Sequence, residues 1–78
     1  MFTVYVIKSS NGLRYTGYTE NIVKRLGQHN SGLSKYTSRG TDWKLIYKET
    51  YDTRAQAMKR EKWLKSGVGR KFLDSLDK

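Results

Sequence analysis

The chain has few side chains that could do chemistry, and one of them is a carboxylate in an unexpected position. Glu61 follows Ala57 by four residues and precedes Leu64 by three, which places it within the apolar stripe of a predicted helix. Burying an unpaired charge is costly, so Glu61 must pair with a cation, bind a metal ion or lie at the edge of a cleft. The residues alone leave both a structural ion pair and a metal-binding or catalytic role open.

A second pair of reactive side chains lies on an earlier predicted helix. Arg25 and His29 are four residues apart, so they share one side of a helix over residues 20–30. Arginine offers paired donors to a phosphate, and histidine titrates near neutral pH and can transfer protons. Taken singly, both residues also fit an ordinary helix surface, so this position alone leaves their role open.

Two tyrosines lie in a predicted hairpin, and its loop decides whether they meet. A two-residue turn at Asn11-Gly12 would turn Tyr5 and Tyr15 to opposite faces. A three-residue loop with Gly12 left-handed would pair Tyr5 with Gly17 and bring both tyrosines to one face. Gly17 would then leave space over Tyr5 for a ligand. The residues do not choose between these registers.

The periodicity of apolar residues predicts the elements that must position these groups. Thr19 is the predicted N-cap of the first helix, and Thr53 with Gln56 fits a capping box at the start of the second. Trp63 should face away from Glu61 and pack on Phe72 or Leu76. The predicted order is β-β-α-β-α-α, with strands over residues 2–9, 13–19 and 43–51, and helices over residues 20–30, 53–65 and 68–76.

Length and composition limit what this chain can be. Its 78 residues predict a single domain over 1–78 with one small core. The absence of Cys and the single His exclude a disulfide scaffold, a thiolate zinc site, a Cys nucleophile and a multi-His metal site. No apolar run is long enough to cross a membrane and no basic segment precedes an apolar one, so we expect a soluble, cytoplasmic protein without membrane contact.

A net charge of +9 is more than solubility requires and favours contact with nucleic-acid phosphates. Tyr36, in the longest predicted loop, could stack on an unpaired base or close the core. The residues that we predict to contact substrate are Gly17, Lys35, Tyr36, Arg39, Lys44, Arg60 and Lys62.

Together these residues form a known pattern. The segments Thr3-Val4-Tyr5 and Tyr15-Thr16-Gly17, followed by Arg25 and His29 on one helix and Glu61 on a later one, resemble the GIY-YIG nuclease superfamily. The likeness runs over residues 2–66 and is strongest to its small standalone members, which resemble the nuclease domain of the excision-repair protein UvrC. It implies an α+β fold with a three-stranded antiparallel sheet flanked by helices, and it favours the three-residue hairpin loop.

The resemblance also implies roles for individual residues. Tyr5 and Tyr15 would be the paired tyrosines, Arg25 the phosphate-binding arginine, and Glu61 the ligand of one Mg²⁺ or Mn²⁺ ion. His29 matches a position near the nucleophile, and the general base stays open among the tyrosines and His29. The implied activity is a metal-dependent DNA endonuclease that hydrolyses phosphodiester bonds in repair or recombination.

The sequence departs from the family pattern at three positions. Thr3 stands where the first motif has Gly, Thr16 where the second has Ile, and Tyr18 where UvrC-like members have Lys. The first two concern strand packing, and the third puts a phosphate contact in question. Target choice would then come from a protein partner or from this chain's own surface.

Two other readings compete with the nuclease. A non-catalytic nucleic-acid-binding module would use the same basic face without metal, and an interaction adaptor would use the surface aromatics without salt-sensitive DNA binding.

Overall fold

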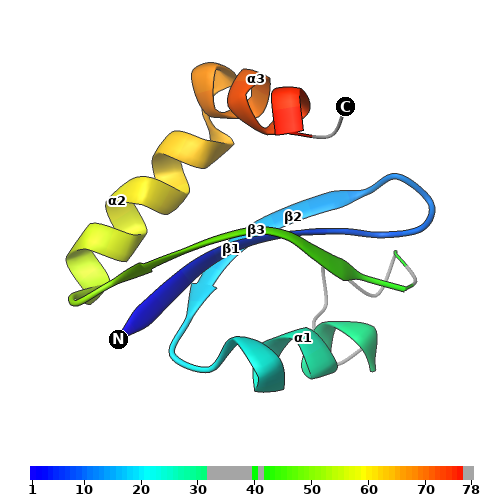
Figure 1. Cartoon of the computed structure of the whole chain (residues 1–78), viewed down its shortest axis with the longest axis horizontal. Coiled ribbons are helices and arrows are strands. Elements are labelled where there is room, and N and C mark those ends of the chain that lie inside the picture. The colour runs from blue at the N-terminus through cyan, green and yellow to red at the C-terminus, as the bar shows by residue number, and fades with distance from the viewer. Residues whose placement is uncertain (32–39, 41, 77–78) are drawn as a thin grey trace.

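The computed structural model describes residues 1–31, 40 and 42–76, and its element order is the predicted one. The strands are β1 (Phe2–Lys8), β2 (Arg14–Thr19) and β3 (Lys44–Tyr51), and the helices are α1 (Ile22–Asn30), α2 (Arg54–Lys65) and α3 (Gly67–Leu76). The strands form one sheet in the order β2-β1-β3, with both pairings antiparallel (Figure 1). This confirms the predicted α+β class.

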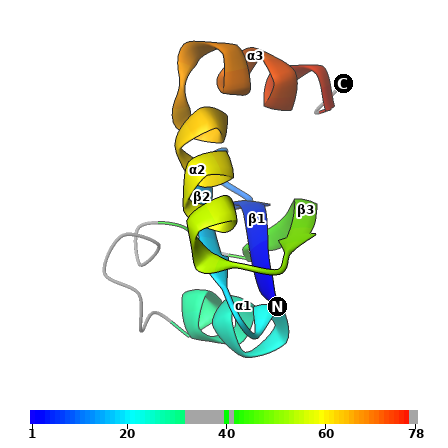
Figure 2. The ribbon, with the colours of Figure 1, turned by 90° about the vertical axis from the view of Figure 1, so that its left-hand side faces the viewer.

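The sheet separates two apolar clusters because β1 alternates its side chains between the faces. Val4 and Val6 point to the face covered by α2 and α3, where they pack with Ala57, Leu64 and Leu73. Tyr5 and Ile7 point to the other face, where Trp43 and side chains of α1 pack on them. Figure 2 shows α1 and α3 at opposite sides of the sheet. The reactive tyrosine therefore belongs to the α1 face.

The hairpin between β1 and β2 has the three-residue loop. Tyr5 pairs with Gly17 and Ile7 pairs with Tyr15, so both tyrosines lie on one face of the sheet. Gly12 has a φ of 89°, a left-handed conformation that glycine adopts without steric cost. Of the two registers that the residues allowed, this is the one that the family resemblance favoured.

A β-bulge at Ile46 changes the direction of the side chains along β3. Val6 pairs with Tyr47 whereas Ile7 pairs with Leu45, which leaves Ile46 as the additional residue. Leu45 therefore packs on the α1 face with Ile7, and Tyr47 packs on the α2 face. The regular alternation that predicted this strand is broken at that point, and the strand serves both clusters.

The predicted cap of α2 is confirmed and the predicted cap of α1 is wrong. The Thr53 hydroxyl accepts from the backbone N–H of Gln56 at 3.2 Å, and the Gln56 side chain accepts from the backbone N–H of Thr53 at 3.3 Å. At α1 the cap is Asn21, whose Oδ1 accepts from the backbone N–H of Lys24 at 3.1 Å. Thr19 is the last residue of β2, two positions too early to reach the first turn.

Helix α3 packs on α2 and on the sheet through aromatic rings. The rings of Trp63 and Phe72 lie 5.9 Å apart, as predicted, and Phe72 also meets Tyr47 edge-on at 5.4 Å. Val68, in the first turn of α3, is 65% exposed and takes no part in this packing. Within the described ranges, no helix has both the length and the apolar character needed to cross a bilayer.

Candidate functional site

Three of the predicted reactive rings gather on the α1 face of the sheet. The ring centroids of Tyr5 and Tyr15 are 6.2 Å apart, and the His29 ring lies 5.8 Å from the first and 5.0 Å from the second. The Tyr5 hydroxyl and His29 Nε2 form a hydrogen bond of 2.7 Å. Tyr5 and His29 are each only 1% exposed, whereas Tyr15 is half-buried at the edge strand. Tyr15 is therefore the ring that a substrate can reach first.

Gly17 makes this arrangement of rings sterically allowed. A Cβ atom at position 17 would lie 3.0 Å from the Tyr5 hydroxyl oxygen and 3.0 Å from a carbon of the Tyr15 ring. The two tyrosines thus fill the space that the missing side chain leaves. The expectation that this space would be open to a ligand is wrong, because the rings themselves occupy it.

Arg25 brings a permanent positive charge to the two tyrosines. Its pKa is raised mainly by a hydrogen bond with Tyr5, and Tyr15 contributes in the same direction. Gln28, three residues further along α1, accepts a hydrogen bond of 3.0 Å from Arg25 Nη1. The guanidinium is half-buried, so it is held near the hydroxyls and still reaches solvent, as a phosphate-binding group must.

Burial moves the pKa values of the two hydrogen-bonded groups apart. Loss of solvent raises the pKa of Tyr5 to about 12, against a smaller opposite effect of its hydrogen bond with Arg25. Loss of solvent, assisted by the charge of Arg25, lowers the pKa of His29 to about 4. At neutral pH Tyr5 is therefore protonated and His29 is uncharged, and the lowered pKa of His29 makes its imidazole a weaker base than a solvent-exposed histidine.

The position of His29 depends on a neighbouring amide that the sequence did not single out. The Asn30 side chain accepts from the Trp43 backbone N–H at 2.7 Å and donates to the Trp43 carbonyl at 3.1 Å. These two bonds fasten the end of α1 to the segment that enters β3. An Asn at the end of a predicted helix is ordinarily taken as a helix-stop signal, so its sequence position did not reveal this role.

Glu61 is close enough to this group to affect it. Its negative charge contributes to the raised pKa of Tyr5, although less than burial does. The Glu61 side chain is 18% exposed, and Lys65 Nζ donates to its Oε2 at 2.7 Å. The structural ion pair that the sequence allowed is therefore present. It does not exclude a second role, because Lys65 is an exposed lysine four residues along the same helix.

The residues around Glu61 fit a magnesium-type ion better than a metal that needs a protein cage. Among the described residues no three His, Cys, Asp or Glu side chains come together. A hard divalent cation that keeps several waters needs one or two carboxylates and a substrate phosphate. Glu61 offers one half-buried carboxylate of this kind, close enough to the tyrosines for its charge to act on Tyr5.

Two of the predicted substrate contacts lie away from this group. Arg60 projects to the α2 face, where Nε and Nη2 donate to the two oxygens of Glu49 at 2.9 and 3.1 Å. Its guanidinium also lies 4.2 Å from the centre of the Trp63 ring. Lys44 pairs with Lys8, which is two residues along β1 from Val6, so Lys44 lies on the α2 face of the sheet.

The remaining predicted substrate contacts are an exposed lysine and three residues that the structure does not describe. Lys62 is exposed on α2. Lys35, Tyr36 and Arg39 lie outside the described residues.

Glu49 is the organising acid of the α2 face, and the sequence analysis missed it. Tyr47, Tyr51 and Arg60 all donate to its carboxylate. Burial acts to raise the pKa of Glu49, and these hydrogen bonds outweigh it and hold the pKa below its usual value. The signal was available, because residues 47, 49 and 51 alternate along a strand and so share one face.

Comparison with known proteins identifies the family of this chain. The model of the GIY-YIG catalytic domain matches residues 1–72. A UPF0213 protein of Staphylococcus saprophyticus is 41% identical over 64 residues, which cover 81% of this chain and 78% of that protein. A UPF0213 protein of Staphylococcus aureus is 39% identical over 71 residues, which cover 90% of this chain and 87% of that protein.

A solved structure shares both the fold and the sequence likeness. The solution NMR structure of a UPF0213 protein from Bacillus halodurans superposes with a TM-score of 0.58 at 31% identity, over 97% of this chain and 85% of that one. The family match spans nearly the whole chain, and the motif tyrosines, arginine and histidine come together in space. The chain therefore belongs to the GIY-YIG catalytic-domain family, a superfamily of nucleases.

Proposed function

We propose that this protein is a metal-dependent DNA endonuclease that hydrolyses phosphodiester bonds. The observation that carries the proposal is the group of Tyr5, Tyr15, His29 and Arg25 on one face of the sheet, within electrostatic reach of Glu61. Family membership supports nuclease chemistry and nucleic-acid binding in general. The choice of DNA, the metal requirement and a role in repair or recombination are part of the proposal.

In this proposal Arg25 binds the phosphate that is cut. Its planar guanidinium donates two hydrogen bonds to phosphate oxygens and stabilises the negative charge that builds up on them. A Mg²⁺ or Mn²⁺ ion at Glu61 would polarise the phosphate and stabilise the leaving oxygen. The side chain of Tyr15, half-buried at the sheet edge, orients the strand against Arg25.

The proton of the attacking water passes to the Tyr5–His29 pair. A tyrosine with a pKa of about 12 is a poor base by itself, since its phenolate would form at high cost. His29 removes this difficulty: the Tyr5 oxygen takes the proton of water while its own proton moves to His29 Nε2. Tyr5 stays neutral throughout, and the imidazole holds the proton only transiently, because a group with a pKa of about 4 releases it again at neutral pH.

A cleavage assay with matched variants tests the proposal. Wild-type protein, Glu61→Gln and, as a control that also removes one negative charge, Asp52→Asn at an exposed turn are incubated with supercoiled, nicked, flapped and branched DNA in Mg²⁺ or Mn²⁺, with and without a chelator. We expect cleavage by wild type and Asp52→Asn, and its loss in Glu61→Gln and with chelator. Cleavage that survives in Glu61→Gln would overturn the assigned role of this carboxylate.

The Glu61–Lys65 ion pair favours a second candidate, a nucleic-acid-binding module without catalysis. In that case Lys65 is the permanent partner of Glu61, and the acid only weakens the attraction of phosphates. Glu61→Gln would then bind DNA as tightly as wild type or more tightly, and no substrate would be cut. A protein partner that directs the chain to its target is compatible with either candidate.

A further inference from the structure

A basic cleft adjoins the tyrosine site at the edge of the sheet. It has a volume of about 360 Å³ and lies between β2 and the end of α2 with the start of α3. Its lining consists of Arg14, Tyr15, Thr16, Leu64, Lys65 and Arg70. Three of these six residues are cations, and none of the six is acidic.

Two residues connect this cleft to the site of the proposed chemistry. Tyr15 lines the cleft and its ring lies 5.0 Å from the His29 ring. Lys65 lines the cleft and donates to Glu61. A ligand in the cleft would therefore lie against Tyr15 and against the lysine that pairs with Glu61.

Two of the cleft's cations are paired with acids that they can exchange for a ligand. Arg14 Nη1 donates to Asp74 Oδ1 at 3.0 Å, and the Asp74 side chain is 66% exposed. Lys65 is likewise an exposed partner of Glu61. Surface ion pairs of this kind contribute about 0–1 kcal/mol each, so a phosphate that offers several charge-assisted hydrogen bonds competes with them.

We propose that this cleft binds a backbone phosphate of the same DNA strand, next to the phosphate that Arg25 holds. Arg14, Lys65 and Arg70 supply the donors, and Lys65 turns from Glu61 toward the phosphate when DNA binds. The inference rests on the proposed function for its ligand. This second phosphate contact requires a DNA strand that continues past the cut on the side of β2. The protein would therefore prefer internal linkages to terminal ones.

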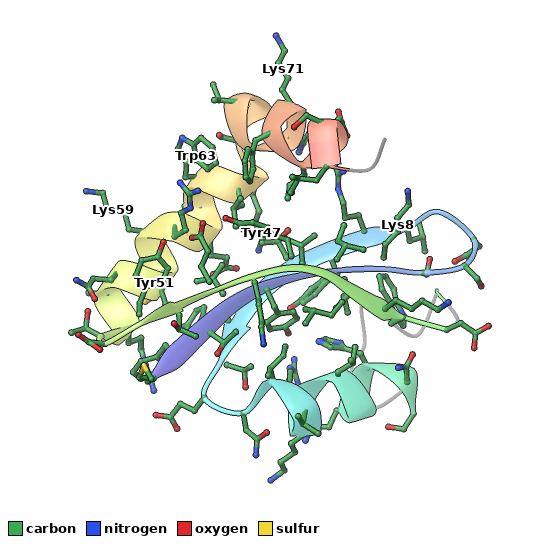
Figure 3. All side chains as sticks on the ribbon, viewed as in Figure 1. Lys8, Tyr47, Tyr51, Lys59, Trp63 and Lys71 are labelled. Carbon is green, nitrogen blue, oxygen red and sulfur yellow. The ribbon has the colours of Figure 1, made fainter. Side chains whose placement is uncertain are left out.

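Arg70 and its neighbour provide a matched pair of variants. Arg70 lines the cleft, whereas Lys71 projects outward from α3 (Figure 3). Both side chains are exposed, and each change to Gln removes one positive charge. A general loss of attraction between the protein and DNA affects both variants equally, whereas loss of a specific phosphate contact affects only Arg70→Gln.

The test measures DNA binding by fluorescence anisotropy in the presence of a chelator, so that no cleavage is needed. The probes are labelled duplexes in which one phosphate at a time is replaced by an uncharged methylphosphonate. We expect Arg70→Gln to bind the unmodified duplex about tenfold more weakly and to lower the log–log salt slope by about one, with Lys71→Gln near wild type. At one position, replacing the phosphate by a methylphosphonate should weaken DNA binding by the wild-type protein but not by Arg70→Gln.

Four results would overturn this inference or separate its failure from that of the nuclease. Equal effects of Arg70→Gln and Lys71→Gln, or no position at which the methylphosphonate and Arg70→Gln effects overlap, would rule out the cleft. Dependence on a 5′-terminal phosphate alone, tested with phosphorylated and unphosphorylated ends, would rule out the internal linkage. DNA binding with these expected responses but without cleavage in Mg²⁺ would support the cleft and contradict the endonuclease.

Discussion

At the scale of single residues, the site depends on a tyrosine and a histidine that are buried against each other. Full burial favours the uncharged form of each, and the hydrogen bond between them pairs the Tyr5 hydroxyl with His29 Nε2. The sequence placed both residues in the site through the family pattern. It could not reveal their burial, because that depends on Trp43 and α1 closing over the sheet.

The buried imidazole predicts a specific dependence of stability on pH. The pKa of His29 is about 4 when folded and near 6.5 when unfolded, so the unfolded chain binds a proton first as the pH falls. The contribution of His29 to the free energy of unfolding should be constant above pH 6.5. It should decrease toward pH 4, by up to about 3 kcal/mol. Urea unfolding between pH 4.5 and 7.5 measures this change.

A comparison with His29→Gln isolates this residue from the carboxylates that also titrate at low pH. Glutamine can still bond to the Tyr5 hydroxyl and does not titrate. The difference in the free energy of unfolding between wild type and His29→Gln should change across this pH range. Parallel curves of unfolding free energy against pH would contradict the lowered pKa of His29.

Gly17 predicts a second effect at this scale. In Gly17→Ala the new Cβ meets the Tyr5 hydroxyl and the Tyr15 ring at 3.0 Å, so we expect a loss of about 1–3 kcal/mol in the free energy of unfolding. Gly27→Ala is the matched control. A Cβ there meets nothing within 4 Å on α1, and it should stabilise the helix by about 0.5–1 kcal/mol. Equal effects of the two substitutions in denaturant unfolding would contradict the steric argument.

At the scale of elements, the contact between α2 and β3 depends on one carboxylate. Glu49 accepts from two tyrosines of its own strand and from Arg60 of α2, and Arg60 also covers the Trp63 ring. Figure 3 shows Tyr47, Tyr51 and Trp63 on this side of the sheet. A residue that the sequence assigned to substrate therefore holds a helix on its strand.

This arrangement predicts different outcomes for two basic residues of α2. Arg60→Gln should lower the free energy of unfolding by about 2 kcal/mol, because Glu49 loses its paired charge-assisted hydrogen bonds. Lys62→Gln, at an exposed position, should change it by less than about 0.5 kcal/mol. Thermal unfolding and DNA binding are measured on both variants. An Arg60→Gln protein of wild-type stability with weakened DNA binding would contradict this structural role and support the substrate contact that the sequence predicted.

At the scale of the whole molecule, the net charge of +9 dominates the approach of any polyanion. The tyrosine site lies on the face that α1 covers, and the basic cleft lies at the β2 edge beside it. A strand that crosses this edge would contact both. The contacts would be made to phosphates, which fix the position of the strand without reading its bases.

The charge predicts binding that depends strongly on salt and little on sequence. With roughly four phosphate contacts, affinity for a short duplex should fall about 100-fold between 50 and 200 mM salt. The affinities for duplexes of equal length and different sequence should decrease in parallel as the salt concentration rises. Anisotropy titrations at several salt concentrations measure both slopes. Salt-independent binding would favour the adaptor reading instead.

The sequence by itself determined the element order and the capping box of α2, and it selected the residues of the candidate site, because these depend on local periodicity and on motif spacing. It left the hairpin register open, since Ser10-Asn11-Gly12 fits two turns that differ little locally. Only pairing across the whole of β1 and β2, with Tyr5 against Gly17, decides between them.

The tertiary structure also decided which charges are bound within the protein. Glu61 meets Lys65, and Arg60 meets Glu49 across eleven residues of sequence and between two elements. A side chain's partner over such a separation depends on how a helix lies on a sheet, and on the bulge at Ile46 that turns Tyr47 to the α2 face. Local spacing shows which groups can react, and packing between elements decides which of them meet.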